Sequence, residues 1–139
     1  MAEFWFDHVG VQVRDLEAAA SALETLFGYR RATRPVTNTR HGVRGMFLEK
    51  PGAMPIKLIT PVDPERADGR YGTHHLAFRT DDIDAAVAAL RQGGARLLSP
   101  PQPGEMFDDE PIAFLYAAGT NVELVTTRDW RDRVGADED

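Results

Sequence analysis

The sequence predicts an α+β fold, in which two paired βαβββ modules form an open, curved half-barrel sheet with the helices outside. Two observations lead to this prediction: a strand–helix unit occurs twice, and three strand-like segments follow each copy. Equivalent residues of the two copies are 67 positions apart (75 − 8, 82 − 15 and 90 − 23), as in the pairs His8 and His75, Asp15 and Asp82, and Leu23 and Leu90. Self-similarity at a fixed offset indicates structural repeats, and two copies favour a pseudo-symmetric pair over an open array.

The second copy of the unit has the clearer pattern. Residues 73–80 are rich in β-branched, aromatic and apolar side chains, which is typical of a strand. Asp82 can cap the helix that follows, because its carboxylate accepts hydrogen bonds from free N–H groups of the first turn. Apolar residues then recur at helical spacing until Gly93 ends the run, namely Ile83, Ala86, Val87 and Leu90.

The first copy follows the same order, with a strand over residues 4–13 and a helix over residues 15–27. Further strands are expected at residues 29–36, 43–49 and 55–60 in the first module and at residues 95–98, 112–116 and 122–127 in the second. We therefore expect one domain over residues 1–139, with module one at about 4–60, a linker at 61–71, module two at about 72–127 and a charged tail at 128–139.

Composition and charge exclude several classes of protein. Hydrophobic residues make up 42% of the 139 residues and charged residues 27%, which is ordinary for a globular domain large enough to bury a core. The net charge of −6 argues against a nucleic-acid partner, and the absence of cysteine excludes disulfides and thiolate chemistry. Because no apolar run reaches membrane-spanning length and no signal-peptide pattern is visible, we expect a cytoplasmic protein without a membrane partner.

Strand parity and the repeat together point to one face of the sheet. His8 and His75 are equivalent under the repeat, and Lys57 and Glu123 occupy equivalent positions in the last strand of each module. If the first strands of the modules meet at the middle of the sheet, all four side chains converge on its concave face. A ligand would bind on that face.

His8, His75 and Glu123 form a candidate metal site. Two imidazoles and a carboxylate can hold a divalent ion and leave positions open for a substrate. The simpler interpretation is that each histidine is a hydrogen-bonded core residue, which is the more frequent role of a lone histidine in a strand. The repeat favours the metal site, because it places the three residues at matching positions for a reason other than hydrophobicity.

Four motifs and their spacing cover the chain to about Thr127, namely Asp7-His-Val-Gly-Val, Leu58-Ile-Thr-Pro61, Gly72-Thr-His-His-Leu-Ala-Phe and Val122-Glu-Leu-Val125. They resemble those of the vicinal oxygen chelate superfamily, also called the glyoxalase/bleomycin-resistance/dioxygenase fold. The doubled histidine, the Asp-Ile-Asp helix start and the Glu-Leu-Val-Thr strand end are most similar to the methylmalonyl-CoA epimerase branch. The resemblance implies a metal ion held by the residues His8, His75 and Glu123.

The chain departs from this family at two positions. The resemblance implies a fourth metal ligand, usually Gln, His or Glu, where this chain has Lys57, and a charged ammonium has no lone pair to offer. It also implies a glutamate base at about the position of Arg40, just before the segment His41-Gly42-Val43. Inversion of a carbon centre needs two opposed bases, so both departures speak against ordinary epimerase activity.

Three functional roles are open for Lys57. It orients an anionic substrate beside an ion held by three ligands, or it pairs with Glu123 and replaces the ion, or it acts as a base or imine-forming amine after desolvation. A solvated surface lysine is the structural alternative. That alternative requires the strand register to slip by one residue, which would turn the side chain outward.

Three polar residues are candidates for substrate contacts. Arg79 shares the face of His75 by strand parity, and Gln12 shares the face of His8. Arg40 belongs to a basic patch near one mouth of the expected cleft, which would suit an acidic substrate. The alternative for each is a solvated position at a strand end or in a loop.

Two further pairs of residues complete the candidate site. Lys57 and His41 are the candidates for proton transfer. Met106 and Phe107 lie at the centre of a long segment rich in proline, glycine and acidic residues. They are candidates for substrate contacts, and we expect them to form a flexible lid or an oligomer contact.

The sequence and the resemblance together favour a metal-dependent isomerase or lyase acting on a small molecule. A divalent ion (Fe, Mn, Co, Ni or Zn) would stabilise an enolate-like state of the substrate. One alternative is an Fe(II)-dependent oxygenase that uses the same His-His-Glu triad. The other is a metal-free small-molecule binding or resistance protein, in which Lys57 displaces the ion. A homodimer is expected, because exposed edge strands need covering.

Overall fold

The computed structural model describes residues 3–67, 69–107 and 109–126, and over these residues it contains two α-helices and one mixed sheet of nine strands. The first half comprises β1 (Trp5–Gln12), α1 (Leu16–Phe27), β2 (Arg30–Arg31), β3 (Val36–Asn38), β4 (Val43–Glu49) and β5 (Ile56–Pro61). The second half comprises β6 (Gly72–Arg79), α2 (Ile83–Gln92), β7 (Arg96–Pro103), β8 (Pro111–Ala117) and β9 (Thr120–Val125). Two short 3₁₀ turns are η1 (Pro64–Ala67) and η2 (Glu105–Phe107).

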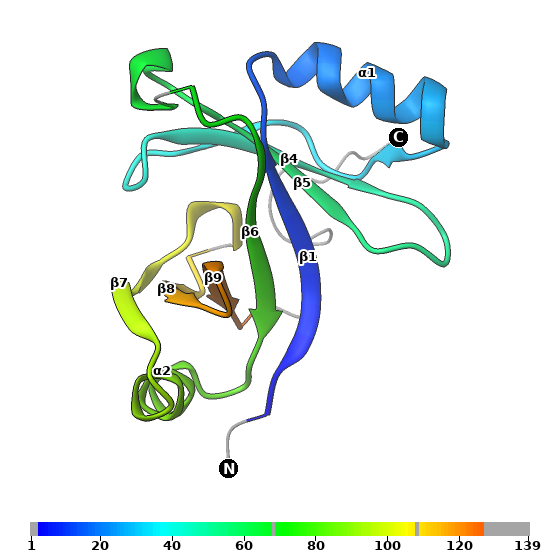
Figure 1. Cartoon of the computed structure of the whole chain (residues 1–139). Helices are drawn as coiled ribbons and strands as arrows, with labels where there is room; N and C mark the ends of the chain where they lie inside the picture. The colour runs from blue at the N-terminus through cyan, green and yellow to red at the C-terminus, as the bar shows by residue number, and fades with distance from the viewer. Residues whose placement is uncertain (1–2, 68, 108, 127–139) are drawn as a thin grey trace.

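The sheet has the strand order β2-β4-β5-β1-β6-β9-β8-β7, with β3 paired to β4, and it does not close into a barrel. The two halves meet where β1 and β6 run antiparallel at its centre (Figure 1). The parallel pairings on either side match each other, because Gly10 of β1 faces Lys57 of β5 and Ala77 of β6 faces Glu123 of β9. The structure therefore confirms the predicted α+β class with an open, curved sheet and two related halves.

Each helix packs on the outer face of its own half of the sheet. Along β4 and β5 the side chains alternate between the two faces, and the outward ones pack with α1 in a cluster of Leu16, Ala20, Met46, Leu48 and Leu58. The helix α2 packs in the same way in a cluster of Ile83, Ala86, Val87, Ala113, Leu115, Val122 and Leu124. Figure 1 shows α1 and α2 at opposite ends of the molecule. The inner face of the sheet is left for the site.

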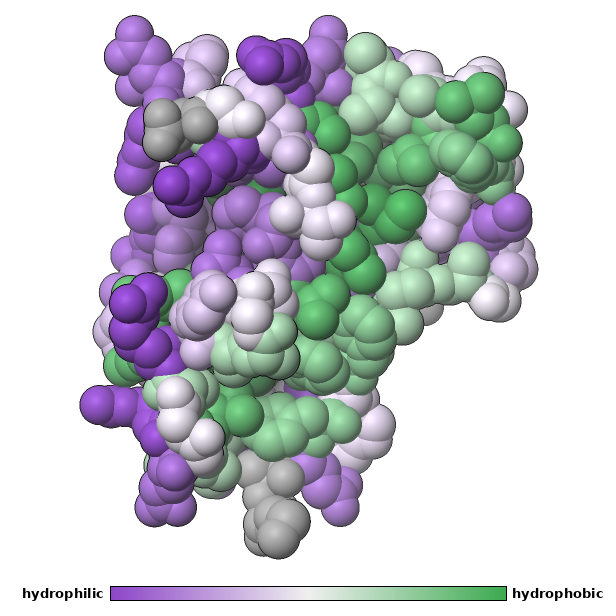
Figure 2. Space-filling view, viewed as in Figure 1, coloured by the Kyte–Doolittle hydropathy of each residue, from purple (hydrophilic) through white to green (hydrophobic). Residues whose placement is uncertain are grey.

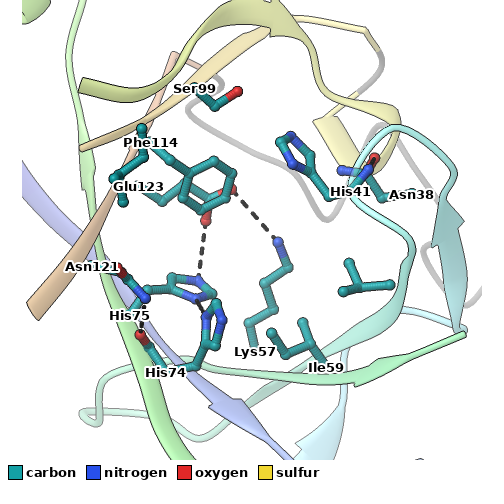
Figure 3. Close-up of a pocket in the computed structure, with 12 residues that line it drawn as sticks. Asn38, His41, Lys57, Ile59, His74, His75, Ser99, Phe114, Asn121 and Glu123 are labelled. Carbon is teal, nitrogen blue, oxygen red and sulfur yellow. Dashed lines mark hydrogen bonds and ion pairs between the residues drawn. The ribbon is translucent and has the colours of Figure 1, made fainter. Parts of the chain in front are cut away.

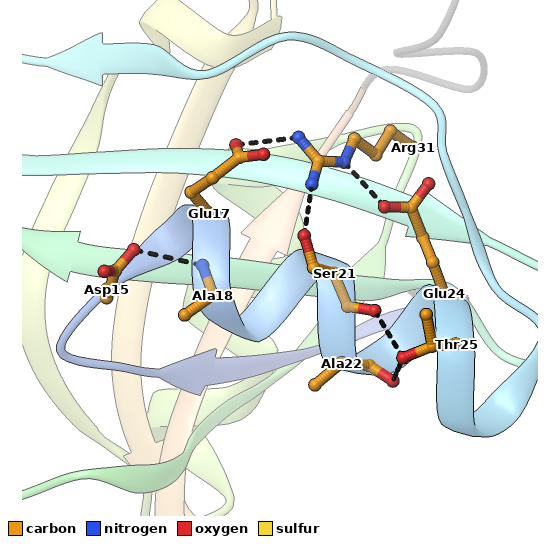
Figure 4. Close-up of polar contacts among 8 residues, drawn as sticks. All are labelled: Asp15, Glu17, Ala18, Ser21, Ala22, Glu24, Thr25 and Arg31. Atoms are coloured by element: carbon orange, nitrogen blue, oxygen red, sulfur yellow. Dashed lines mark hydrogen bonds and ion pairs between the residues drawn. The ribbon is translucent and has the colours of Figure 1, made fainter.

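Local interactions cap α1 and connect it to β2. The carboxylate of Asp15 accepts the backbone N–H of Ala18 at 3.0 Å and so caps the first turn. Arg31 in β2 reaches back to the helix and donates to the carboxylates of Glu17 and Glu24, at 2.7 and 3.0 Å (Figure 4). These ion pairs are largely exposed, so each contributes little to stability. They connect α1 to β2.

A third cluster lies on the inner side of the sheet and joins the two halves. It consists of Phe47 from the first half with Met106, Phe107, Ile112 and Val125 from the second. Met106 is 2% exposed and Phe107 is 1% exposed. The expectation of a flexible lid or oligomer contact at these two residues is therefore wrong. The turn η2 packs against β3, so the chain that follows β7 is directed into the core.

Two strands differ from those predicted. The expected strand over residues 29–36 is not continuous, since β2 ends at Arg31 and β3 begins only at Val36. Between them, the hydroxyl of the buried Thr33 accepts the backbone N–H of Phe47 at 2.9 Å. The strand β7 extends to Pro103 despite its prolines, which is possible because β7 lies at an edge of the sheet. The charged tail expected at 128–139 lies outside the described residues.

Several large apolar side chains are exposed on the surface, where a partner could cover them. Apolar side chains are exposed at Phe6 in β1 (45%) and at Leu26 and Phe27 at the end of α1 (71% and 59%). Figure 2 shows hydrophobic surface over the middle of the molecule and at the α1 end. A homodimer stays a prediction. Within the described ranges, no helix is both long enough and apolar enough to cross a membrane.

Candidate metal and substrate site

The structure brings four of the candidate site residues together on the inner face of the sheet. Nε2 of His8 and Nε2 of His75 each lie 3.2 Å from Oε1 of Glu123. Nζ of Lys57 lies 3.7 Å from Oε2 of the same carboxylate. None of the four residues is more than 4% exposed. The register of β5 on β1 therefore turns Lys57 inward, and the alternative of a surface lysine does not apply.

Space for the His75 ring comes from Gly10. The register of β1 on β6 places Gly10 opposite His75. A Cβ atom at Gly10 would lie 2.0 Å from Cε1 of the imidazole, far inside van der Waals contact. The absence of a side chain in β1 is thus what allows the ring to lie over that strand and approach Glu123.

The second nitrogen of each imidazole also has a partner. Nδ1 of His8 lies 2.6 Å from Oδ2 of Asp7, and Nδ1 of His75 lies 2.8 Å from Nδ1 of His74. A carboxylate can only accept a hydrogen bond, so His8 donates from Nδ1. Nε2 is then the His8 atom that faces Glu123, and it is the atom through which His8 would bind a metal ion.

The charges of the cluster favour deprotonated ligands. Burial alone would raise the pKa of Glu123, but the Lys57 ammonium and the nearby imidazoles of His75 and His8 outweigh it and hold this pKa well below its usual range. Burial lowers the pKa of His75 to about 4. At neutral pH the site therefore offers a carboxylate and a neutral imidazole, the forms that bind metal ions.

The donor set fits a divalent cation. The ligand atoms of His8, His75 and Glu123 all lie within 4.8 Å of one another. Among the described residues, Nε2 of His75 and Oε2 of Glu123 are buried without a hydrogen-bond partner, and such atoms are rare in native proteins unless an ion or water satisfies them. Two imidazoles with one carboxylate form a facial set that suits Zn²⁺ and Fe²⁺ while leaving positions open.

A cavity of about 320 Å³ opens onto this cluster at His75, Glu123 and Lys57 (Figure 3). Both halves of the molecule line it, with polar groups from Asn38, His41, His74, Ser99 and Asn121 and apolar groups from Val43, Ile59, Leu98 and Phe114. Its volume and mixed lining are suited to a small molecule with a few polar atoms.

His41 reaches the cavity from the turn between β3 and β4. Its backbone N–H donates to Oδ1 of Asn38 at 3.2 Å, and its ring packs edge-on against Phe114 with the centroids 5.0 Å apart. Burial lowers the pKa of His41, so its ring is neutral at pH 7 and can accept a proton. Figure 3 shows His41 and Lys57 on the same cavity.

None of the five candidate substrate-binding residues lines this cavity. Arg79 donates to the carboxylate of Asp81 at 2.9 Å, and Gln12 donates to the backbone carbonyl of Arg70 at 2.8 Å. Arg40 is exposed on the turn that carries the neighbouring histidine. Strand parity placed Gln12 and Arg79 on the correct faces but could not place them along the strands. Met106 and Phe107 lie in the core.

Sequence reasoning assigned no role to several residues that do line the cavity. His74 is the most important of them, because its ring contacts His75. The signal was available in the repeat, since His74 follows Asp7 by the same 67 positions (74 − 7) and Asp7 contacts His8. No such signal marks Asn121 or Ser99, which reach the cavity only through the tertiary fold.

Comparison with known proteins gives consistent results. The family model described as "Glyoxalase/Bleomycin resistance protein/Dioxygenase superfamily" matches residues 7–114. The chain is 30% identical over 126 residues to an ethylmalonyl-CoA/methylmalonyl-CoA epimerase from Cereibacter sphaeroides, and the match covers 86% of this chain and 92% of the relative.

Solved structures of similar proteins agree with this match. The crystal structure of methylmalonyl-CoA epimerase from Mycobacterium tuberculosis is 31% identical with a TM-score of 0.75, and the match covers 88% of this chain and 87% of that one. A methylmalonyl-CoA epimerase in complex with methylmalonyl-CoA and NH4+ is 28% identical with a TM-score of 0.73, covering 88% of this chain and 94% of that one. The fold thus has solved counterparts.

Proposed function

Because the chain belongs to the Glyoxalase/Bleomycin resistance protein/Dioxygenase superfamily, we propose that it is a metal-dependent isomerase or lyase. Its ion would be held by His8, His75 and Glu123. The observation that carries the proposal is the pair of buried atoms without hydrogen-bond partners, Nε2 of His75 and Oε2 of Glu123, at the floor of a cavity. The similar proteins are named as epimerases of acyl-CoA thioesters, so an acyl thioester is the first substrate to assay.

Lewis acidity toward a carbonyl oxygen of the substrate is the chemistry that a divalent ion would supply there. The residues around it would bind and orient the substrate. The Lys57 ammonium, 3.7 Å from Glu123, can attract an anionic group or a developing negative charge. Ile59 and Phe114 give the cavity an apolar wall, which would exclude water from the carbon that reacts.

Proton transfer would depend on His41 and Lys57. His41 is neutral at pH 7 because burial lowers its pKa, so it can take a proton from a carbon beside a carbonyl. Lys57 lies in the same cavity and can return a proton as an ammonium. His41 comes from the turn between β3 and β4, and Lys57 comes from β5. The two groups can therefore act on different sides of the substrate.

The first test is metal content. Protein purified without a histidine tag should retain a divalent ion in near-stoichiometric amount by elemental mass spectrometry, and Glu123→Gln should lose most of it. Glu17→Gln is the matched control, because it removes a carboxylate that is 72% exposed on α1. If the Glu123→Gln protein folds by circular dichroism and retains as much metal as the control, the metal site is not at this triad.

The second test is proton exchange in D2O. With the metal-loaded protein and methylmalonyl-CoA, deuterium should appear at the carbon beside the thioester carbonyl, as read by mass spectrometry. His41→Gln should slow exchange at least tenfold, because general acid–base groups contribute about 10² to 10⁴ in rate. Exchange that occurs at the same rate without metal would rule out the role proposed for the ion.

The contact between Lys57 and Glu123 favours a second candidate, a metal-free small-molecule binding protein. An ammonium 3.7 Å from the central carboxylate can supply the positive charge that a cation would otherwise supply. Absence of metal in the purified protein, together with ligand binding that a chelator does not change, would support it. Oxygen uptake that requires Fe(II) would instead indicate an oxygenase on the same triad.

A further inference from the structure

A β-bulge brings two consecutive histidines to the same cavity. Consecutive side chains of a regular strand point to opposite faces. In the pairing of β6 with β1, His75 lies opposite Gly10 but Thr73 lies opposite Val11, so His74 is an extra residue. A bulge of this kind re-aims a side chain. Both rings therefore turn toward the site, and their Nδ1 atoms lie 2.8 Å apart.

The bulge has a further partner in the sheet. The side-chain amide of Asn121 in β9 donates to the backbone carbonyl of His74 at 3.4 Å (Figure 3). The backbone of His74 is therefore in contact with β9 as well as lying in the bulge against β1.

The first half of the molecule has an irregularity at the equivalent place. The register of β1 on β6 also shifts between Phe6 and His8, so Asp7 is the extra residue there. Asp7 contacts Nδ1 of His8 in the same way as His74 contacts Nδ1 of His75. In both halves, the residue just before the candidate ligand thus contacts Nδ1 of that ligand, the ring nitrogen that does not face Glu123.

Asp7 and His74 differ in the hydrogen bonds that they can make to the neighbouring imidazole. The carboxylate of Asp7 only accepts a hydrogen bond, so it keeps the proton of His8 on Nδ1. The imidazole of His74 can either donate or accept at Nδ1. Two neutral rings joined Nδ1 to Nδ1 share one proton between these atoms, so the tautomer of one ring sets the tautomer of the other.

Two arrangements of the protons follow. When Nε2 of His75 carries its proton and faces Glu123, Nδ1 of His75 accepts from His74, and Nε2 of His74 is left as an unprotonated acceptor. When Nε2 of His75 instead gives its lone pair to a metal ion, the proton of His75 is on Nδ1. His74 then accepts at Nδ1 and carries its own proton on Nε2. Each ring has one proton in both arrangements, so no net protonation change is needed.

We propose that His74 is a positioning residue for His75 and that metal binding converts its Nε2 from an acceptor into an N–H donor toward the cavity. The inference rests on the proposed metal site. Because His74 lines the cavity, this donor would bind a carbonyl or carboxylate oxygen of the substrate. The exchange is confined to the second half, since Asp7 holds His8 in one tautomer.

The test is the tautomer of His74, read by nuclear magnetic resonance. The chain has four histidines, so two-bond 15N–1H correlations of the 15N-histidine-labelled full chain can be assigned with a His74→Gln variant. Addition of Zn²⁺, a diamagnetic ion, should move the His74 proton from Nδ1 to Nε2. Bound Zn²⁺ with an unchanged His74 tautomer overturns this inference alone. Failure to bind Zn²⁺ overturns the proposed metal site as well.

Zn²⁺ affinity provides an independent readout. His74→Phe removes the acceptor for the Nδ1 proton of His75, and loss of such an outer partner typically weakens metal binding about 10- to 100-fold. His74→Gln should recover part of the affinity, because its carbonyl oxygen can accept the same proton. His41→Phe is the matched control, since it removes another imidazole from the cavity without touching a ligand. Equal Zn²⁺ affinity in folded His74→Phe and in the control would contradict the positioning role.

Discussion

Lys57 is the residue that distinguishes this site at the scale of single side chains. It faces Gly10 across β5 and β1, as Glu123 faces Ala77 across β9 and β6. The two halves therefore place a cation and an anion at equivalent positions, 3.7 Å apart. A cation at this position competes with a metal ion for the carboxylate, so Lys57 should control how tightly metal is held.

Removal of the Lys57 charge should tighten metal binding. Two unit charges about 4 Å apart interact by roughly 4 kcal/mol at an effective dielectric constant near 20, so the expected gain in Zn²⁺ affinity is at least tenfold for Lys57→Met. Lys57→Gln should gain more, because its amide oxygen adds a ligand. Both values can be measured by competition with a chromophoric chelator.

The control for this prediction is Lys50→Gln. Lys50 is exposed, and its ammonium donates to the backbone carbonyl of Phe27, away from the cavity. Zn²⁺ affinity should not change in this variant. If Lys57→Met binds Zn²⁺ more weakly than the parent chain, the ammonium supports the site and does not compete with the ion.

At the scale of secondary structure elements, the site depends on how β1 and β6 cross at the centre of the sheet. Each strand carries one irregularity in its register with the other. Gly10 of β1 leaves room for the ring of His75, while the equivalent position of β6 carries Ala77. The two halves thus share a backbone arrangement, but only the first half has a glycine that makes room for an imidazole ring.

Gly10→Ala should displace His75 and weaken the site. The new Cβ would lie 2.0 Å from the imidazole, and the ring is buried, so it cannot move away without loss of packing. We expect Zn²⁺ affinity to fall at least tenfold and the melting temperature to decrease, as measured by calorimetry. Gly93→Ala is the matched control, because a Cβ there would meet only ordinary contacts at 3.5 Å or more. Unchanged Zn²⁺ affinity in Gly10→Ala would show that the ring does not need this space.

At the scale of the whole molecule, the inner cluster couples the two halves. Phe107 from η2 lies with its ring centroid 5.9 Å from that of Phe47 in β4. It also packs over the site, with its ring 6.4 Å from His8 and 5.2 Å from Nζ of Lys57. The segment expected to be a lid is therefore part of the core beside the candidate ligands.

Phe107→Ala should destabilise the whole fold. Truncation of a buried phenylalanine typically costs about 3–5 kcal/mol through lost transfer energy and the cavity left behind. The expected measurement is a matching decrease in the free energy of unfolding by urea, with one cooperative transition. Leu98→Ala, at an apolar side chain that is 44% exposed, is the control and should change little. A Phe107→Ala protein as stable as this control would place the segment outside the core after all.

The sequence by itself determined the class of the fold and the residues of the triad. The offset of 67 residues, the caps at Asp15 and Asp82 and the alternation in the strands are all local or periodic signals, and local signals survive without knowledge of packing. The family motifs agreed with them, and the fold class is confirmed. His8, His75 and Glu123 could be named because the repeat relates equivalent positions.

The tertiary structure decided which other residues join the triad. Whether Met106 and Phe107 lie in a lid or in the core depends on the contact of η2 with β3, which are distant in sequence. Only the bulge in β6 turns His74 toward the cavity, and a bulge breaks the period of two on which parity depends. The distance between Lys57 and Glu123 is likewise decided by the tertiary structure, because the two side chains come from separate halves of the molecule. Their separation depends on how β1 pairs with β6 at the centre of the sheet, and no local sequence pattern specifies that register.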